Sequence, residues 1–139
     1  MYTISKEFTF SAAHSLSHLP SNHPCSNEHG HNYTVIVELS ATKLDSNSFV
    51  VDYRELEPMK KFIDKIFDHR NLNDFLPFPA TVENIAKFLY HVFVRYNSKV
   101  SAVTVKETDK TAMRYTTDHD EVNFEHYSLV RTLMEQLNT

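Results

Sequence analysis

The stretch His29-Gly30-His31-Asn32-Tyr33-Thr34-Val35-Ile36-Val37-Glu38-Leu39-Ser40-Ala41 decides the fold, because apolar and polar residues alternate along most of it. Side chains on a β-strand point alternately to the two faces of a sheet. One face here therefore carries His29, His31, Tyr33, Val35, Val37 and Leu39. The pattern predicts a half-buried strand that brings two imidazoles onto its apolar face. Gly30, the only glycine of the chain, separates them and lets a backbone or ligand approach closely.

A second alternating stretch, Tyr2 to Phe10, predicts another half-buried strand, and His14 follows it. A lone histidine near an apolar face is more often a hydrogen-bonded core residue than a ligand. Two histidines on one strand face favour a ligand role instead, because each unpaired buried polar group costs about 1–3 kcal/mol. With His14 from a facing strand, His29 and His31 make a three-histidine set that leaves the fourth position of zinc open, as in catalytic sites. The other histidines are expected on the surface or in loops: His18, His23, His91, His119 and His126.

Two helices are predicted in the middle of the chain. A short extended piece at residues 49–53 ends at Asp52, a helix N-cap, and apolar residues then recur at helical spacing from about Arg54 to Phe67. Thr81 caps a second helix, whose apolar stripe runs from Val82 to Tyr96.

The remaining segments complete an α+β fold. Residues 100–107 and 112–117 read as a strand and its hairpin partner, which gives the order β-β-α-α-β-β and a four-stranded antiparallel sheet with both helices on one face. A further helix is expected in residues 118–139, so the chain divides into a domain at 1–117 and a C-terminal helical extension. Open sheet edges are usually covered or extended by another subunit, which favours a homo-oligomer.

Composition narrows the class of protein. A chain of 139 residues with 41% hydrophobic residues suits one globular domain. The net charge of -4 argues against a broad nucleic-acid surface, and neither a membrane-spanning run nor a signal-peptide core is visible. A single cysteine cannot form an internal disulfide, which suits a reducing cytoplasm.

Glu107 is the most informative acid. Because side chains alternate along the predicted strand, Glu107 shares the inward face with Val103 and Val105. Burying a carboxylate on that face costs free energy unless it has a partner. A planar N–H pair of a heterocycle would satisfy it through bidentate, charge-assisted hydrogen bonds. The alternative is a salt bridge at the end of the strand, with a partner among Lys106, Lys110 and Arg114.

Three more residues carry chemistry. Asp68 could fix the tautomer of the adjacent His69 and raise its basicity, although a histidine at a helix C-terminus is also favoured for its charge alone. Cys25 lies in the loop of residues 15–28 and could be inert, but a nearby cation would lower its pKa and make it a base. The zinc signatures H-E-x-x-H and P-C-x-x-C are absent from the sequence.

Several motifs together resemble the 6-pyruvoyl-tetrahydropterin synthase/6-carboxytetrahydropterin synthase family. They are Phe10-Ser11-Ala12-Ala13-His14, Cys25-x3-His29-Gly30-His31-Asn32-Tyr33, Phe67-Asp68-His69, Asn71-Leu72-Asn73, Thr81-x-Glu83-Asn84 and Val105-Lys106-Glu107-Thr108. The resemblance covers residues 2–115. Three residues between Cys25 and His29 resemble the bacterial 6-carboxytetrahydropterin synthases of queuosine biosynthesis, whereas animal pyruvoyl enzymes have a longer spacing.

The resemblance implies a tunnelling fold, in which subunits join their sheets into trimers that stack into hexamers. It implies zinc on His14, His29 and His31. It also implies Cys25 as the proton-abstracting base, Asp68 and His69 as the partner acid/base, and His69 donated across an interface. The residues implied to hold the pterin's amino-pyrimidine edge are Glu107, Thr108 and Thr81.

The implied substrate is 7,8-dihydroneopterin triphosphate, and the implied products are 6-carboxy-5,6,7,8-tetrahydropterin, acetaldehyde and triphosphate. Two alternatives stay open: a 6-pyruvoyl-tetrahydropterin synthase, and a non-catalytic zinc- and pterin-binding protein. The chain departs from the family at Ser26-Asn27-Glu28, where many relatives carry a basic residue, and in a tail longer than usual. Lys110 and Arg114 are the candidates for phosphate recognition.

Overall fold

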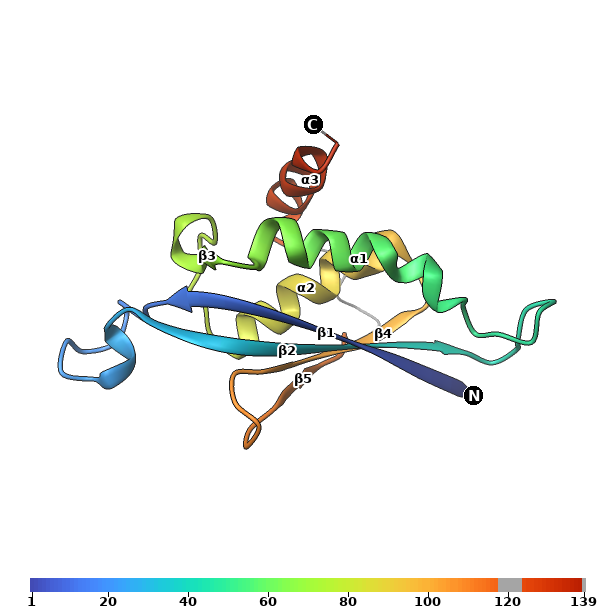
Figure 1. Ribbon diagram of the computed structural model, residues 1–139, viewed down its shortest axis with the longest axis horizontal. Coiled ribbons are helices and arrows are strands. Elements are labelled where there is room, and N and C mark those ends of the chain that lie inside the picture. Colours follow the sequence, from blue (N-terminus) through green and yellow to red (C-terminus); the bar gives the residue numbers. More distant parts are fainter. Residues whose placement is uncertain (118–123, 139) are drawn as a thin grey trace.

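Two long antiparallel strands form the centre of the sheet in the computed structural model, which describes residues 1–117 and 124–138 (Figure 1). Strand β1 (Tyr2–His14) pairs with β2 (His29–Ala41) along its full length, from Tyr2 opposite Ala41 to His14 opposite His29. The other edge of β2 pairs with β4 (Val100–Lys106), which pairs in turn with β5 (Met113–Tyr115). The predicted strands are confirmed, and the register sets two of the three candidate ligands face to face.

The sheet has five strands and is mixed, so the expectation of four antiparallel strands is wrong. Strand β3 (Arg70–Asn71) pairs in parallel with Ala12 and Ala13 at the outer edge of β1, and the order is β3-β1-β2-β4-β5. A strand of two residues is too short to show alternation in sequence. Its position depends instead on His69, whose φ of 59° turns the chain and whose N–H donates to the Ser11 carbonyl at 2.7 Å.

The first helical segment agrees with the predicted range and contains a π turn. A 3₁₀ turn (Tyr53–Leu56) leads into α1 (Glu57–Phe62), which continues as a π-helical turn (Ile63–Phe67). Asp52 accepts a hydrogen bond from the Arg54 N–H at 2.9 Å, which confirms the predicted cap. The prediction of an extended segment at residues 49–53 is wrong, because these residues form bends and the start of the 3₁₀ turn.

Helix α2 (Val82–Tyr96) crosses the same face of the sheet as α1, as predicted (Figure 1). Its Thr81 cap is confirmed, because the Thr81 hydroxyl accepts a hydrogen bond from the Asn84 N–H at 3.2 Å. His91 on this helix is only 3% exposed and stacks on Phe124 at 4.0 Å between ring centroids, so its prediction as a surface residue is wrong. The segment that follows the sheet covers this side of α2, which sequence periodicity alone could not show. His119 lies outside the described residues.

The C-terminal helix α3 (Tyr127–Gln136) confirms the helix expected beyond the sheet. Val130 and Leu133 are buried in the same apolar core as the helices and strands, together with Phe124. Two single-turn 3₁₀ helices, Pro24–Ser26 and Leu72–Asp74, lie in the connections near the end of β1. Within the described ranges, no helix is both long and apolar enough to cross a membrane.

Replacing Leu133 with Ala tests whether α3 is part of the folded domain. The side chain is 5% exposed, so removing it should lower the free energy of unfolding by about 2–5 kcal/mol. Urea denaturation measures this loss, and Thr132→Ala on the exposed face is the control, with an expected change within about 0.5 kcal/mol. Equal unfolding midpoints for the two variants would mean that α3 contributes no packing.

Candidate active site

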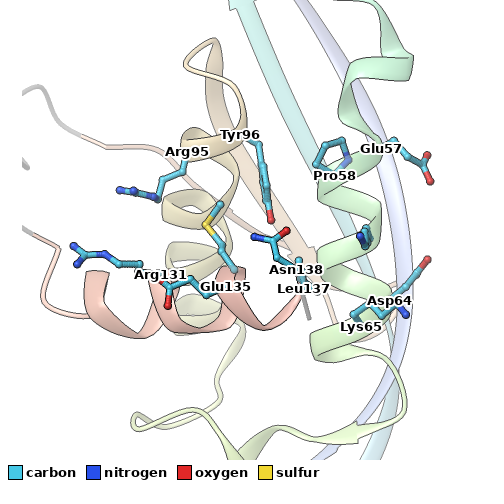
Figure 2. A pocket seen from close by; sticks show the side chains of 12 residues that line it. Glu57, Pro58, Asp64, Lys65, Arg95, Tyr96, Arg131, Glu135, Leu137 and Asn138 are labelled. Carbon is cyan, nitrogen blue, oxygen red and sulfur yellow. The ribbon is translucent and has the colours of Figure 1, made fainter.

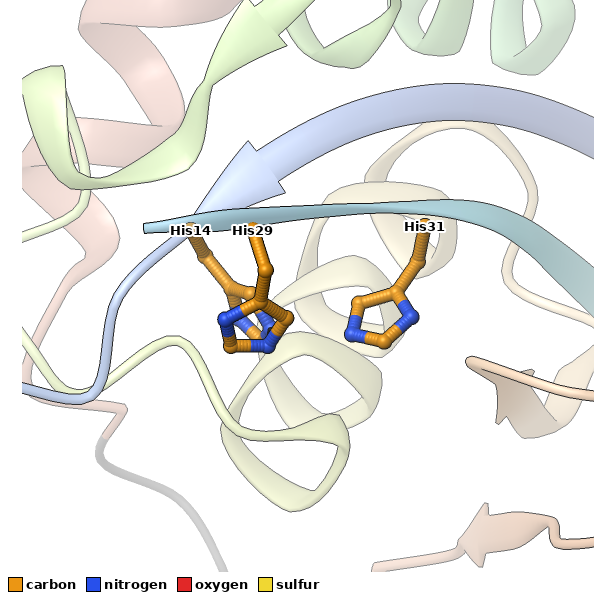
Figure 3. A group of neighbouring side chains, drawn as sticks. All are labelled: His14, His29 and His31. Carbon is orange, nitrogen blue, oxygen red and sulfur yellow. Dashed lines mark hydrogen bonds between the residues drawn. The ribbon is translucent and has the colours of Figure 1, made fainter. Parts of the chain in front are cut away.

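Three imidazoles meet at the end of the β1–β2 pair (Figure 3). His14 and His29 are partners in the register, and His31 follows two residues later on the same face. The Nε2 atoms of His14 and His29 are 3.0 Å apart, and one nitrogen from each of the three rings lies within 4.8 Å of the others. The predicted ligand set is therefore assembled by strand register within a single chain.

Backbone carbonyls orient two of the rings. His14 donates from Nδ1 to the Ala80 carbonyl at 2.7 Å, and His29 donates from Nδ1 to the Asn27 carbonyl at 2.7 Å. This assignment leaves a lone pair on each Nε2, and the two lone pairs face one another. Such outer contacts are typical of metal-bound histidines. No sequence pattern points to Ala80 or Asn27, because every residue type carries a backbone carbonyl.

The three imidazoles fit a bound metal ion. Burial lowers the pKa of His14 against the opposing effect of its bond to Ala80, which keeps the ring neutral and able to coordinate. The Nε2 atom of His31 is buried without a hydrogen-bond partner among the described residues. A cation between the rings would satisfy this atom and remove the repulsion between the other two. Imidazole sites of this kind suit zinc, copper, iron or nickel.

Glu107 extends the site from the end of β4. Its Oε2 atom lies 3.7 Å from Nε2 of His31, and its side chain is 27% exposed. Arg114, one of the alternative salt-bridge partners, instead donates to Glu38 at 2.7 and 3.2 Å. The inward face predicted for Glu107 therefore brings its carboxylate close to His31, one of the candidate metal ligands.

Tyr33 lies beneath the site and was not identified from the sequence as a functional residue. Its ring is stacked on Phe10 at 4.7 Å and lies 5.5 Å from the ring of His31. Its hydroxyl is buried without a hydrogen-bond partner in the described part of the chain, and burial raises its pKa, helped by the charge of Glu107. Alternation predicted the face of Tyr33, but only the structure reveals the unpaired hydroxyl.

Asp68 and His69 form a pair at the outer edge of β1. Asp68 accepts a hydrogen bond from the Ser11 N–H at 2.8 Å, and its other oxygen is 3.4 Å from Nε2 of His69. The imidazole is 83% exposed. A groove of about 540 Å³ is lined by both His31 and His69, together with Gly30 and Arg70. The Asp68 carboxylate and the His69 ring thus lie side by side, as they would if the aspartate orients the histidine.

Cys25 and the two threonines are held by local hydrogen bonds. Cys25 is a free, partly buried thiol in the 3₁₀ turn, where its N–H donates to Nδ1 of His23 at 3.0 Å. The Thr108 hydroxyl accepts a hydrogen bond from the Lys110 N–H at 3.3 Å. Because the Thr81 hydroxyl caps α2, it is already engaged in a structural role.

A larger cavity than the groove at His31 and His69 lies elsewhere, between α1 and α3 (Figure 2). It has a volume of about 620 Å³, and its lining mixes basic, acidic and apolar side chains. It shares no residue with the histidine site. Volume alone would point to this cavity as the binding site. The convergence of polar side chains points to the three histidines instead.

The family model described as 6-pyruvoyl tetrahydropterin synthase matches residues 3–118. The chain belongs to this family. The three histidines, Cys25, Asp68, His69 and Glu107 all lie inside the matched range, whereas α3 lies beyond it. The family resemblance inferred from the motifs is confirmed, and the chain is similar to tetrahydropterin synthases.

Individual relatives in this family carry two different names. A protein of Archaeoglobus fulgidus provisionally named 6-carboxy-5,6,7,8-tetrahydropterin synthase is 35% identical over 101 residues, 73% of this chain and 84% of that protein. The 6-carboxy-5,6,7,8-tetrahydropterin synthase of Bacillus subtilis is 33% identical over 96 residues, 64% of this chain and 63% of that protein. The structure of 6-pyruvoyl tetrahydropterin synthase from Caenorhabditis elegans matches with a TM-score of 0.74 and 29% identity, over 84% of this chain and 96% of that one.

Replacing His31 with Ala should remove the bound metal. The two remaining imidazoles leave an incomplete site, so the protein should lose bound zinc on dialysis, measured as metal per chain by atomic emission. His18→Ala, which removes an exposed loop imidazole, is the control and should keep its zinc. One zinc per chain in the His31 variant would exclude this residue as a ligand.

Proposed function

We propose that this protein is a zinc-dependent 6-carboxytetrahydropterin synthase. It would convert 7,8-dihydroneopterin triphosphate and water to 6-carboxy-5,6,7,8-tetrahydropterin, acetaldehyde and triphosphate, in the biosynthesis of queuosine. The observation that carries the proposal is the convergence of three imidazoles beside one carboxylate, Glu107. This arrangement offers a metal with an open position next to an acceptor for a heterocycle.

The roles of the metal ligands follow from their hydrogen bonds. The carbonyls of Ala80 and Asn27 hold the Nδ1 protons of His14 and His29, so that both rings present Nε2. The chemistry that zinc supplies when bound is Lewis acidity toward the substrate's side-chain hydroxyls, worth several kcal/mol.

Glu107 would bind the amino-pyrimidine edge of the pterin. An ionised carboxylate accepts two parallel N–H bonds, and its place on a half-buried face strengthens them. Thr108 follows it in sequence and would add a hydroxyl to the same edge. Thr81 is the weaker of the proposed contacts, because its hydroxyl is occupied in capping α2.

Two residues would move protons. The Cys25 thiolate would take a proton from the substrate side chain, and His69 would hold and return a proton at its imidazole while Asp68 orients the ring. Each proton transfer of this kind contributes about 10²–10⁴-fold to the rate. The 83% exposure of His69 supports its donation to the site of a neighbouring copy, which would make the active enzyme a homo-oligomer.

The short spacing between Cys25 and His29 and the names of the two relatives support the carboxy-forming reaction. The structural similarity to the enzyme of Caenorhabditis elegans favours a second candidate, a 6-pyruvoyl-tetrahydropterin synthase, which eliminates triphosphate without carbon–carbon cleavage. The presence of Cys25, Asp68 and His69 argues against a non-catalytic zinc- and pterin-binding protein. The proposed reaction needs the free thiol of Cys25, which supports a reducing cytoplasm as the location of the protein.

Incubating the zinc-loaded protein with 7,8-dihydroneopterin triphosphate decides between the reactions. We expect equal amounts of acetaldehyde and 6-carboxy-5,6,7,8-tetrahydropterin, measured by derivatisation and by mass spectrometry. Pyruvoyltetrahydropterin without acetaldehyde would establish the second candidate instead, and binding without any product would establish the non-catalytic one.

Cys25→Ala is the matched variant for this assay. It should lower the turnover number by about 10²–10⁴-fold while the zinc content stays at the wild-type level, because the thiol is assigned to proton transfer and not to the metal. Undiminished turnover would exclude Cys25 as the base.

A further inference from the structure

The Glu107 carboxylate lies close to His31, one of the three candidate metal ligands. Its Oε2 atom is 3.7 Å from Nε2 of His31, an atom that has no hydrogen bond of its own among the described residues. The carboxylate is on the helix side of the sheet, as the three imidazoles are, because β4 continues the alternation of Val103 and Val105. A half-buried carboxylate in this place needs a cation or a donor.

The spacing between these atoms resembles that between two ligands of one metal ion. In tetrahedral zinc sites with ligands at about 2.0–2.2 Å, neighbouring ligand atoms are about 3.3–3.6 Å apart. The Nε2 atoms of His14 and His29 are 3.0 Å apart, and the Glu107 oxygen is 3.7 Å from the third nitrogen. The distance from the Glu107 oxygen to the His31 nitrogen is therefore close to that between two ligands of one zinc ion.

We propose that Glu107 is an exchangeable fourth ligand that occupies the metal while no pterin is bound. The second half of this inference rests on the proposed function: the N–H pair of a pterin ring competes for the same carboxylate. When the ring takes the carboxylate, the fourth position opens for the substrate's hydroxyl groups. One residue thus couples recognition of the heterocycle to opening of the metal site.

This exchange has a thermodynamic consequence that a pterin anchor alone would not have. Two ligands that compete for one group weaken each other's binding reciprocally. A pterin ring without a side chain cannot replace the lost oxygen on the metal, so it should weaken zinc binding. Removing the carboxylate should also weaken zinc binding in the absence of any pterin.

Zinc affinity, measured by competition with a chromogenic chelator, tests the ligand role without any activity assay. We expect Glu107→Gln to weaken zinc binding about tenfold or more, and Glu107→Asp to weaken it similarly because the shorter side chain retracts the charge by one methylene. Glu28→Gln is the matched control: it removes a negative charge next to His29 in sequence, from a side chain that bonds Asn71 at 3.2 Å. An affinity equal to wild type in both Glu107 variants, or an equal loss in Glu28→Gln, would overturn the proposal.

The cobalt-loaded protein tests the exchange. Adding unsubstituted pterin should change the visible absorption spectrum of wild type, as the carboxylate leaves the metal, and should leave that of Glu107→Gln unchanged. Pterin binding to the cobalt protein without a spectral change would contradict the exchange. If pterin does not bind at all, the proposed synthase function fails, whereas the ligand role is still decided by the zinc affinities. Circular dichroism of the metal-free variants checks that each is folded.

Discussion

The repulsion between two imidazole nitrogens 3.0 Å apart is the constraint on which the rest of the site depends. The full-length register of β1 and β2 forces His14 opposite His29, and two backbone carbonyls hold the Nδ1 protons on the outer sides of the rings. When both rings are neutral, each presents a lone pair to the other, in a place where burial lowers the pKa of His14. A cation between them would convert this cost into coordination, so the strand pairing also builds the candidate metal site.

The same sheet organises the remaining chemistry around that point. Extension of β4 brings Glu107 to His31, and the parallel addition of β3 to β1 holds Asp68 and His69 at the outer edge. The π turn at the end of the first helical segment contributes as well, because the Asp68 N–H bonds to the Ile63 carbonyl five residues back, at 2.9 Å. π turns of this kind often occur at functional sites. The residues proposed for recognition of a heterocycle, for metal binding and for proton transfer are thereby attached to different strands of one sheet.

Sequence alternation predicted the site more completely than it predicted the sheet. His29, His31 and Glu107 could be assigned to one face because a period of two allows no other choice once the strand is recognised. The β3 strand was missed because two residues carry no period, and its pairing follows from the backbone of His69. The burial of His91 was missed because it depends on a segment from outside the sheet, and the buried Tyr33 hydroxyl was missed because its lack of a partner among the described residues depends on the surrounding chain. Both are properties of tertiary packing, which no local pattern contains.

X-ray absorption spectroscopy of the zinc-loaded protein tests the central claim most directly, because it reports the ligand atoms themselves. The account predicts a first shell of nitrogen and oxygen at about 2.0–2.2 Å, with the outer-shell scattering typical of three imidazoles. Sulfur at about 2.3 Å would contradict it, because Cys25 would then be a metal ligand and not the proton carrier.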